Sequence, residues 1–365
     1  MTDRLEAAFS ADAAEVLAQD LPWHRFSGRR IVVTGAGGFV GGHLLRALLA
    51  LQDSGRLETP LTAVAPVRSI ERTRARLEAI ADHPRLELVE WDFNSIALPD
   101  LGDLHFVIHA ASQSSPKHFG PDPVGTAIPN GVGTAALLTA LQASSDPQGF
   151  LFVSSGAAYG AVQPGTPVAE GDYGVLDPLD PSWIYGESKR YGETLCAAWS
   201  LQYGLHTTIG RLGHTYGAGL QSDDGRAFVD FAYAAARGEP IVLLSDGSVV
   251  RPYCYISDAV AGLFAVLLRG ATGNAYNVSN PRGELSILEL AELISGLSPT
   301  PGLEVSRRVR ADDSGYLPNP VAKASVDVSK LEAIGWRATV LPEEGFRRML
   351  DSLDPTPQMP PGPSR

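Results

Sequence analysis

The sequence predicts an α/β protein that contains a doubly wound parallel sheet and a smaller C-terminal lobe. Three observations lead to this prediction. Short apolar strand segments alternate with helical segments through the first half of the chain, and a glycine-rich turn joins the first strand to the first helix. Beyond residue 212 the pattern becomes irregular, with longer loops. Apolar strands that are separated by helices are typical of a parallel sheet buried on both faces.

The expected strands are short segments rich in Val, Ile, Leu and Phe. They lie at residues 29–35, 61–67, 86–93, 105–112 and 149–155, and two further strands near 206–212 and 274–279 return to the same sheet. The expected helices between them lie at 41–52, 72–82 and 130–142. The resulting division is a helical extension (1–27), a dinucleotide-binding domain (28–211), a lobe that is mainly substrate-binding (212–350) and a tail (351–365).

Both ends of the chain differ from this alternating pattern. Residues 3–20 form an acidic helical segment with apolar side chains on one side. This segment is either a packing appendage or a dimer or lid element. The last eleven residues, PTPQMPPGPSR, are rich in proline, and we expect residues 351–365 to be disordered.

The composition of the chain indicates which kinds of ligand and binding partner to expect. The 365 residues carry a formal net charge of −12, which disfavours nonspecific binding to nucleic acid or to an anionic membrane. The two cysteines form no CxxC or Cys/His cluster, so we expect neither a metal site nor a disulfide framework. The first residues, MTDRLEAAFS, have no apolar core of a signal peptide, and no run of about 18 apolar residues is evident. The expected location is the cytoplasm.

The segment IVVTGAGGFVGGHLL places Gly35, Gly38 and Gly41 between the first strand and the first helix. The first glycine permits a tight turn, the second lets the backbone approach a pyrophosphate, and the third lets helix and strand pack closely. The start of the helix then offers free N–H groups to the anion. A glycine motif in this strand–turn–helix context predicts a Rossmann-type dinucleotide site.

The residue at the end of the second strand bears on the choice between NAD and NADP. The usual acidic residue at its end is missing, because APVRS places Arg68 there. An arginine at this position can bind the 2′-phosphate of NADP, although Arg68 could also stack on adenine or face solvent. Asp92, after the third strand, either accepts a hydrogen bond from the adenine amino group or caps a loop.

The segment YGESK places Tyr185 four residues before Lys189, on one face of a helix. Such a pair occurs by chance in many helices, but here Ser154 and Ser155 end a strand about thirty residues upstream. A phenol has a pKa near 10, so lowering it by about 3 units for catalysis at neutral pH requires about 4 kcal/mol. A lysine ammonium and an oxidised nicotinamide can supply this energy, while the serine hydroxyl holds the substrate alcohol.

In this order the motifs resemble the extended short-chain dehydrogenase/reductase family, in the branch of NAD-dependent nucleotide-sugar epimerases and dehydratases. The resemblance covers about residues 28–350 and rests on TGAGGFVG, VIHAAS, PNGVGT, VSSGAAYG, YGESK and RPYCYISDA. It implies that Ser155, Tyr185 and Lys189 are catalytic, with Ser155 chosen because it lies four residues before Tyr159. It also implies a homodimer through helices at 130–143 and 185–203.

The resemblance also implies which residues bind the two ligands. The cofactor residues are Gly35, Gly38, Phe39, Val40, Gly41, Arg68, Asp92, Phe93, Ala110, Ala111, Ser112, Asn130, Val153, Tyr185 and Lys189. The substrate residues are Ser155, Gly156, His214, Arg226 and Arg251. Arg251 matches an arginine that binds the substrate diphosphate, unless it forms a structural salt bridge.

The sequence allows more than one role for some of the substrate-side residues. His214 stands where the family usually has Asn, so it either contacts substrate or is a buried structural histidine. The segments SQSSPKHFGPDPVGT and DDGRAF resemble UDP-glucuronate decarboxylases, so Lys117 and Arg226 are candidates to hold an anionic sugar or phosphate.

One departure from the family decides the expected reaction. The 4,6-dehydratases carry an Asp-Glu pair directly after the serine and the decarboxylases carry a Glu, but this chain has Gly156 and Ala157. A redox couple without those carboxylates suits a 4-epimerase, whose redox-neutral cycle keeps NAD bound and therefore favours NAD over NADP. Cys254 or Glu187 could supply a missing acid or base, although a buried thiol and a solvated charge are the simpler interpretations.

The first hypothesis is therefore a nucleotide-diphosphate-sugar 4-epimerase, with dehydration or decarboxylation as alternatives. A second hypothesis is a carbonyl reductase that uses exchangeable NADPH, which Arg68 favours and Arg251 disfavours. A third is a non-catalytic protein on the same fold, which the presence of both Tyr185 and Lys189 disfavours.

Overall fold

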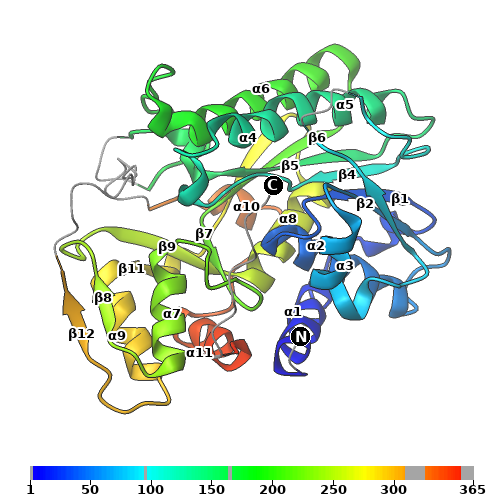
Figure 1. Ribbon diagram of the computed structural model, residues 1–365. Coiled ribbons are helices and arrows are strands. Elements are labelled where there is room, and N and C mark those ends of the chain that lie inside the picture. The colour runs from blue at the N-terminus through cyan, green and yellow to red at the C-terminus, as the bar shows by residue number, and fades with distance from the viewer. Residues whose placement is uncertain (1–2, 94–96, 163–166, 309–324, 355–365) are drawn as a thin grey trace.

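The computed structural model describes residues 3–93, 97–162, 167–308 and 325–354 (Figure 1). Its main feature is a seven-stranded sheet in the order β10-β6-β5-β4-β1-β2-β3, in which every neighbouring pair is parallel. The strands are β1 (Arg30–Thr34), β2 (Thr62–Val67), β3 (Leu86–Glu90), β4 (Phe106–His109), β5 (Gly149–Ser155), β6 (Thr207–Leu212) and β10 (Asn274–Val278). This confirms the predicted fold class, including the two returning strands.

Helices cover both faces of this sheet. Figure 1 shows α4, α5 and α6 on one face, with α2 and α8 on the other. The strand β1 shows why: Ile31 and Val33 pack into the core beneath α2 and α8, whereas Val32 packs into the core beneath α5 and α6. Successive side chains of a strand point to opposite faces, so a strand with two covered faces has to be apolar throughout. The helices are α2 (Phe39–Asp53), α3 (Ile70–Leu77), α4 (Pro123–Ile128), α5 (Thr134–Gln142), α6 (Ile184–Tyr203) and α8 (Ile256–Arg269).

The helical segment that was expected from residue 130 begins earlier and is interrupted. A π-helical stretch, Pro129–Gly133, joins α4 to α5. Pro129 has no N–H group, so the regular α-helical hydrogen bond is lost at this point. By length and composition the whole segment Pro123–Gln142 is apolar enough to cross a membrane, so the expectation of no such segment was wrong. This is weak evidence of a membrane span, because the core helix of a soluble protein passes the same test, and α5 packs on α6 and the sheet.

Within the described residues, the smaller lobe is built from short strands and three helices. Its strands are β7 (His214–Tyr216), β9 (Val250–Tyr255), β11 (Glu284–Ser286), β8 (Ile241–Leu243) and β12 (Val305–Arg307), and its helices are α7 (Ala227–Arg237), α9 (Ile287–Leu297) and α11 (Pro342–Ser352). The short helix α10 (Ser329–Glu332) lies against the large sheet instead. The strands β11, β9 and β7 form one sheet, and β12 pairs with β8. Although α8 and β10 lie within residues 212–350, they belong to the large sheet and its cover, and α10 packs against them.

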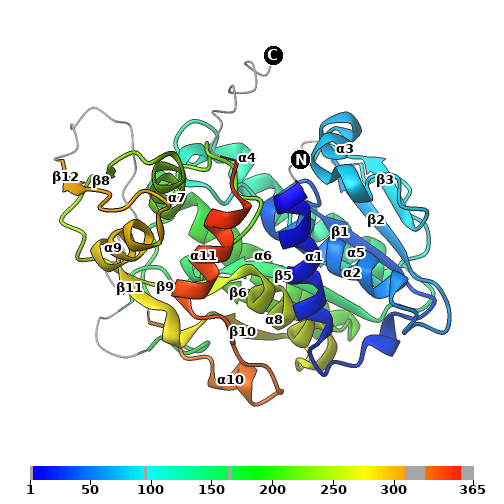
Figure 2. The same ribbon diagram turned by 90° about the horizontal axis from the view of Figure 1, so that it is seen from below.

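The N-terminal helix α1 (Asp3–Leu17) packs against α2, α8 and α11 (Figure 2). Two polar contacts hold it there: Glu15 accepts hydrogen bonds from the Ser257 hydroxyl at 2.8 Å and from the Arg348 guanidinium at 2.6 Å. At the other end, α11 runs to Ser352, so the first two residues of the expected disordered tail are helical. Residues 355–365 of that expected tail lie outside the described residues.

Candidate active site

The turn between β1 and α2 requires glycine for steric reasons. Gly35 has φ of 71°, a left-handed conformation that favours glycine. A Cβ atom on Gly35 would lie 2.8 Å from the Ala110 carbonyl oxygen, and one on Gly41 would lie 2.2 Å from the Gly35 carbonyl oxygen. No side chain caps the first turn of α2, so its N–H groups are available to an anion. The turn therefore fits the pyrophosphate of a dinucleotide.

A cleft of about 1330 Å³ runs along the carboxyl ends of the strands. It is larger than the roughly 300–1,000 Å³ of a typical small-molecule pocket, so it has room for two ligands. The strand order reverses between β1 and β4, which is where open α/β sheets bind ligands. The cleft is lined by the predicted residues Gly35, Gly38, Phe39, Val40, Gly41, Arg68, Asp92, Phe93, Ala110, Ala111, Ser112, Val153, Ser155, Gly156, Tyr185, Lys189, His214, Arg226 and Arg251.

Asn130 is the predicted cofactor residue that does not line the cleft. Its side chain is fully buried, and its Nδ2 lies 3.1 Å from the Ser112 hydroxyl and 3.0 Å from the Ser188 hydroxyl. Asn130 therefore links Ser112, in the wall of the cleft, to Ser188 on α6.

Three side chains meet at the end of β5 and the start of α6. The Tyr185 hydroxyl is hydrogen-bonded to the hydroxyl of Ser155, the last residue of β5. Lys189 follows one helical turn after Tyr185, with its Nζ 5.8 Å from the centroid of the Tyr185 ring. The Nζ of Lys189 donates to the Val153 carbonyl oxygen at 2.7 Å. Phe119 stacks on the Tyr185 ring, with centroids 5.0 Å apart, which restrains the orientation of the phenol.

Burial dominates the electrostatics of this group. It lowers the pKa of Lys189 to about 7, and the negative charge of Glu193 opposes that shift. Burial raises the pKa of Tyr185, while the hydrogen bond from Ser155 and the positive charge of Arg226 act in the opposite direction. The protein alone thus keeps Tyr185 protonated, and a further positive charge in the cleft would be needed to form a phenolate near neutral pH.

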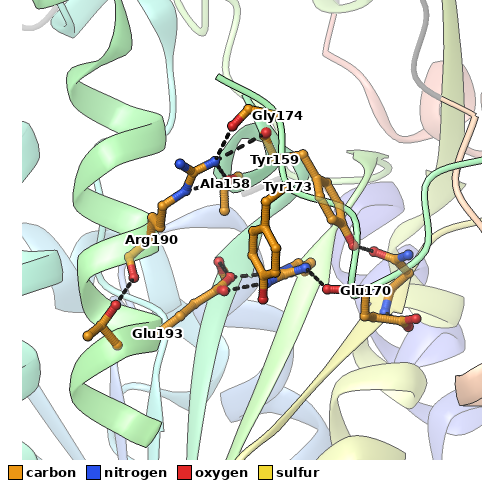
Figure 3. A network of polar contacts seen from close by, with 11 residues as sticks. Ala158, Tyr159, Glu170, Tyr173, Gly174, Arg190 and Glu193 are labelled. Atoms are coloured by element: carbon orange, nitrogen blue, oxygen red, sulfur yellow. Dashed lines mark hydrogen bonds and ion pairs between the residues drawn. The ribbon is translucent and has the colours of Figure 1, made fainter. Parts of the chain in front are cut away.

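Behind Lys189 lies a buried polar network, part of which Figure 3 shows. Arg211 on β6 donates to both carboxylate oxygens of Glu193, at 2.9 and 2.6 Å, and Glu193 also accepts from the Ser154 hydroxyl at 2.5 Å. The Arg211 guanidinium lies 4.6 Å from the centroid of Tyr159 and 5.4 Å from that of Tyr173. Sequence reasoning missed Glu193, although its position four residues after Lys189 placed it on the same helical face.

A second network holds the strand ends in place. The His109 ring is fully buried, and burial lowers its pKa to about 3, so it is neutral. Because the Pro129 carbonyl only accepts, the His109 Nε2–H donates to it at 2.9 Å, and Nδ1 accepts from the Thr34 hydroxyl at 2.7 Å. The Thr34 oxygen in turn accepts from the Ala111 N–H at 3.1 Å. His109 thereby ties β1 and β4 to the π-helical stretch.

On the substrate side the cations are partly neutralised. Arg226 donates to both carboxylate oxygens of Asp224, at 2.5 and 2.9 Å, and Lys117 forms an ion pair with Asp223 at 3.0 Å. Arg251 is 8% exposed. Burial, with the charges of Arg251 and Arg226, lowers the pKa of His214 to about 3, so this imidazole is neutral.

The two candidates for a missing acid or base lie elsewhere. Neither Cys254 nor Glu187 lines the cleft, and burial raises the pKa of the Cys254 thiol well above its usual value. Within the described ranges, no group of three or more His, Cys, Asp or Glu side chains could hold a metal ion.

Comparison with known proteins places this arrangement in a family. The model of the NAD dependent epimerase/dehydratase family matches residues 31–279. The chain is 31% identical over 326 residues to UDP-glucuronic acid decarboxylase 6 of Arabidopsis thaliana, covering 88% of each protein. It is 30% identical to UDP-glucuronic acid decarboxylase 1 of Xenopus tropicalis, covering 88% of this chain and 71% of that protein. The chain belongs to the NAD dependent epimerase/dehydratase family, an enzyme family whose cofactor is NAD.

Solved structures share the fold. The UDP-glucuronic acid 4-epimerase of Bacillus cereus, solved with UDP-glucuronic acid and NAD, has a TM-score of 0.74 at 22% identity and covers 88% of this chain and 98% of that one. The dTDP-glucose 4,6-dehydratase DesIV of Streptomyces venezuelae, solved with NAD and TYD bound, has a TM-score of 0.73 at 25% identity, with coverage of 88% and 95%. The sequence relatives reported above are decarboxylases, and the fold is shared with a 4-epimerase and a 4,6-dehydratase.

Proposed function

We propose that this chain is a nucleotide-diphosphate-sugar 4-epimerase whose substrate is a UDP-hexose or UDP-hexuronate. The observation that carries the proposal is the Ser155–Tyr185–Lys189 group, which faces the cleft with Gly156 and Ala157 next to it. This leaves an oxidation–reduction site without the adjacent carboxylates that dehydration or assisted decarboxylation would use.

Each residue has a defined role in the proposed reaction. NAD bound in the cleft would supply reversible hydride transfer at C4 of the sugar and, when oxidised, a positive charge near Tyr185. Ser155 holds the C4 hydroxyl, and Tyr185 removes its proton as a phenolate. Lys189, whose Nζ is fixed by the Val153 carbonyl, stabilises that phenolate and orients the bound ribose. Inversion at C4 requires the keto sugar to turn within the cleft before hydride returns to its other face.

The charges around the cleft favour an anionic sugar. Arg251, nearly buried at 8% exposure, is the proposed contact to the diphosphate because a guanidinium matches phosphate oxygens. Arg226 lines the same cleft as Tyr185 and is the proposed contact to a C6 carboxylate, which would share its guanidinium with Asp224. His214, neutral and beside Arg251, can donate one hydrogen bond to the substrate.

Decarboxylation of a UDP-hexuronate is the second candidate, and the decarboxylase relatives favour it. Oxidation at C4 makes the C6 carboxylate a β-keto acid, which can lose carbon dioxide when the carboxylate is poorly solvated. The two reactions differ in their products: the epimerase product keeps its carboxylate, whereas the decarboxylase product is a pentose.

Incubation with UDP-glucuronate, UDP-glucose, UDP-N-acetylglucosamine and dTDP-glucose, followed by proton NMR, tests the proposal. We expect UDP-glucuronate to give a C4-inverted hexuronate. A pentose product would select the second candidate, and absence of turnover with all four would contradict both. The Tyr185→Phe variant is the matched inactive control.

We also propose a homodimer through the face formed by α5 and α6. A hollow of about 570 Å³ on this face is lined by Leu98, Gly131, Val132, Ala135, Ala136, Thr139, Ala140, Ala143 and Tyr191. Val132 and Tyr191 are large apolar side chains that remain 42% and 56% exposed, which a second copy would cover.

A further inference from the structure

The end of the cleft where dinucleotide folds place the adenosine ribose has an unusual charge. In such folds an Asp or Glu near the end of the second strand accepts from the ribose 2′-hydroxyl. Here β2 ends at Val67 and is followed by Arg68 and Ser69, both of which line the cleft. Arg72, one turn into α3, lines the same wall. A carboxylate that would repel a 2′-phosphate is therefore replaced by two guanidinium groups.

These two guanidinium groups differ from the other arginines of α3. Arg74 forms an ion pair with Asp82 and lies outside the cleft. Arg76 lines the cleft but donates to the Gly37 carbonyl oxygen at 2.9 Å, so it supports the glycine turn. Within the described residues, the guanidinium groups of Arg68 and Arg72 make neither a hydrogen bond nor an ion pair, and both residues are exposed.

The backbone between them adds to this anion-binding character. Ser69 is the N-cap of α3, and its hydroxyl accepts from the Arg72 N–H at 3.3 Å, which fixes the spacing of the two arginines. The start of α3 thus brings its positive helix end and two guanidinium groups to one wall of the cleft. Two carboxylates lie nearby: Glu71 is in the first turn of α3, and hydrogen bonds and, to a lesser extent, the charge of Arg68 lower the pKa of Asp122. The formal net charge of the chain is −12, so this cationic wall stands against the average charge of the molecule.

We propose that Arg68 and Arg72, with the first turn of α3, bind the 2′-phosphate of NADP, and that this chain binds NADP more tightly than NAD. The proposal rests on the assignment of the cleft as the dinucleotide site, and does not depend on which sugar reacts. It leaves the proposed chemistry unchanged, because the nicotinamide ends of the two dinucleotides are identical. The proposed preference for NADP differs from the name of the family, which specifies NAD.

A competition experiment that needs no sugar tests this proposal. The purified protein is dialysed against equal concentrations of NAD⁺ and NADP⁺, and the two bound forms are then measured by native mass spectrometry. We expect at least ten NADP-bound molecules for each NAD-bound molecule, and a ratio that falls as salt is raised because exposed charges are screened. A ratio of one or below would overturn the proposal.

Three exposed positions provide variants that should fold normally. Arg72→Ala should weaken NADP⁺ binding about tenfold and change NAD⁺ binding less than twofold, since a charge-assisted hydrogen bond to one ligand is lost. Arg68→Asp should reverse the preference by about 100-fold. Arg74→Ala, on the same helix but outside the cleft, is the control and should change neither affinity.

The same variants separate the proposal from its main competitor. If Arg68 only stacks on adenine, its replacement weakens NAD⁺ and NADP⁺ equally, and that result would refute the proposed phosphate site. Failure of the proposed epimerase activity would leave these binding ratios unaffected, so the two proposals can fail separately.

Discussion

The carboxylate of Glu193 should control the protonation of Lys189. Burial lowers the pKa of Lys189 to about 7, and Glu193 opposes this shift from the next helical turn. Two unit charges about 6 Å apart interact by roughly 3 kcal/mol at an effective dielectric constant of about 20. This corresponds to about 2 pKa units. Glu193→Gln should therefore lower the pKa of Lys189 from about 7 to about 5.

The consequence should be visible in the pH dependence of turnover. Lys189 loses its charge as pH rises through its pKa, so the alkaline limb of the kcat/KM profile, which reports the free enzyme, should move about 2 units to lower pH in Glu193→Gln. Near pH 7.5, an approximate assay pH, the rate should fall about 100-fold, because the charged fraction of Lys189 falls by that factor. Glu193→Asp keeps the negative charge, so its alkaline limb should lie close to the pH at which the wild-type limb lies.

Two controls separate this effect from a loss of structure. Glu193→Gln leaves Arg211 without its ion-pair partner, so its melting temperature should fall, and profiles are to be measured well below it. Glu187→Gln removes a charge from the same helix outside the cleft and should leave the profile unchanged. An alkaline limb that stays in place in folded Glu193→Gln would refute the electrostatic reasoning.

Three further predictions concern stability, cofactor binding and assembly. Burial raises the pKa of the Asp12 carboxyl to about 7, so the folded state binds the extra proton and the free energy of unfolding should fall between about pH 4 and pH 7. Asp12→Asn should remove this decrease, which amounts to as much as roughly 4 kcal/mol in the free energy of unfolding measured with denaturant at each pH. If the variant keeps the same slope with pH, the raised pKa does not belong to Asp12. Gly41→Val should abolish NAD binding in calorimetry, because its Cβ would meet a carbonyl oxygen of the turn at 2.2 Å; normal binding would exclude the proposed pyrophosphate site. Val132→Asp should yield a monomer in sedimentation, while a persistent dimer would place the interface elsewhere.

The local motifs of the large domain could be predicted from the sequence because each depends on residues close together in the chain. The turn at Gly35 and Gly41 follows from backbone geometry that only glycine tolerates, and it lies between β1 and α2 as expected. The positions of Tyr185 and Lys189 on one helical face follow from the period of the helix. The strands β1, β2, β4 and β5 are mostly apolar and buried on both faces, so the parallel sheet could also be inferred.

Some of the features that were missed depend on pairs that are distant in sequence. Lys117 and Asp223 are 106 residues apart, so the neutralisation of that cation was not predictable from either segment. The burial of Asp12 depends on α1 packing against Tyr255, whose hydroxyl is hydrogen-bonded to it. The π-helical stretch was missed because a regular helix was expected to begin at Asn130, and α4, which precedes it, was not expected.

The fate of the hydrogen on C4 tests the central claim most directly. UDP-glucuronate that carries deuterium at C4 is to be turned over in ordinary water, and the product analysed by NMR and mass spectrometry. Transfer of hydride to the cofactor and back predicts that the product keeps the deuterium at C4, with transient reduction of the bound dinucleotide that Tyr185→Phe abolishes. Loss of the label to solvent, or turnover without reduction of the dinucleotide, would contradict the account.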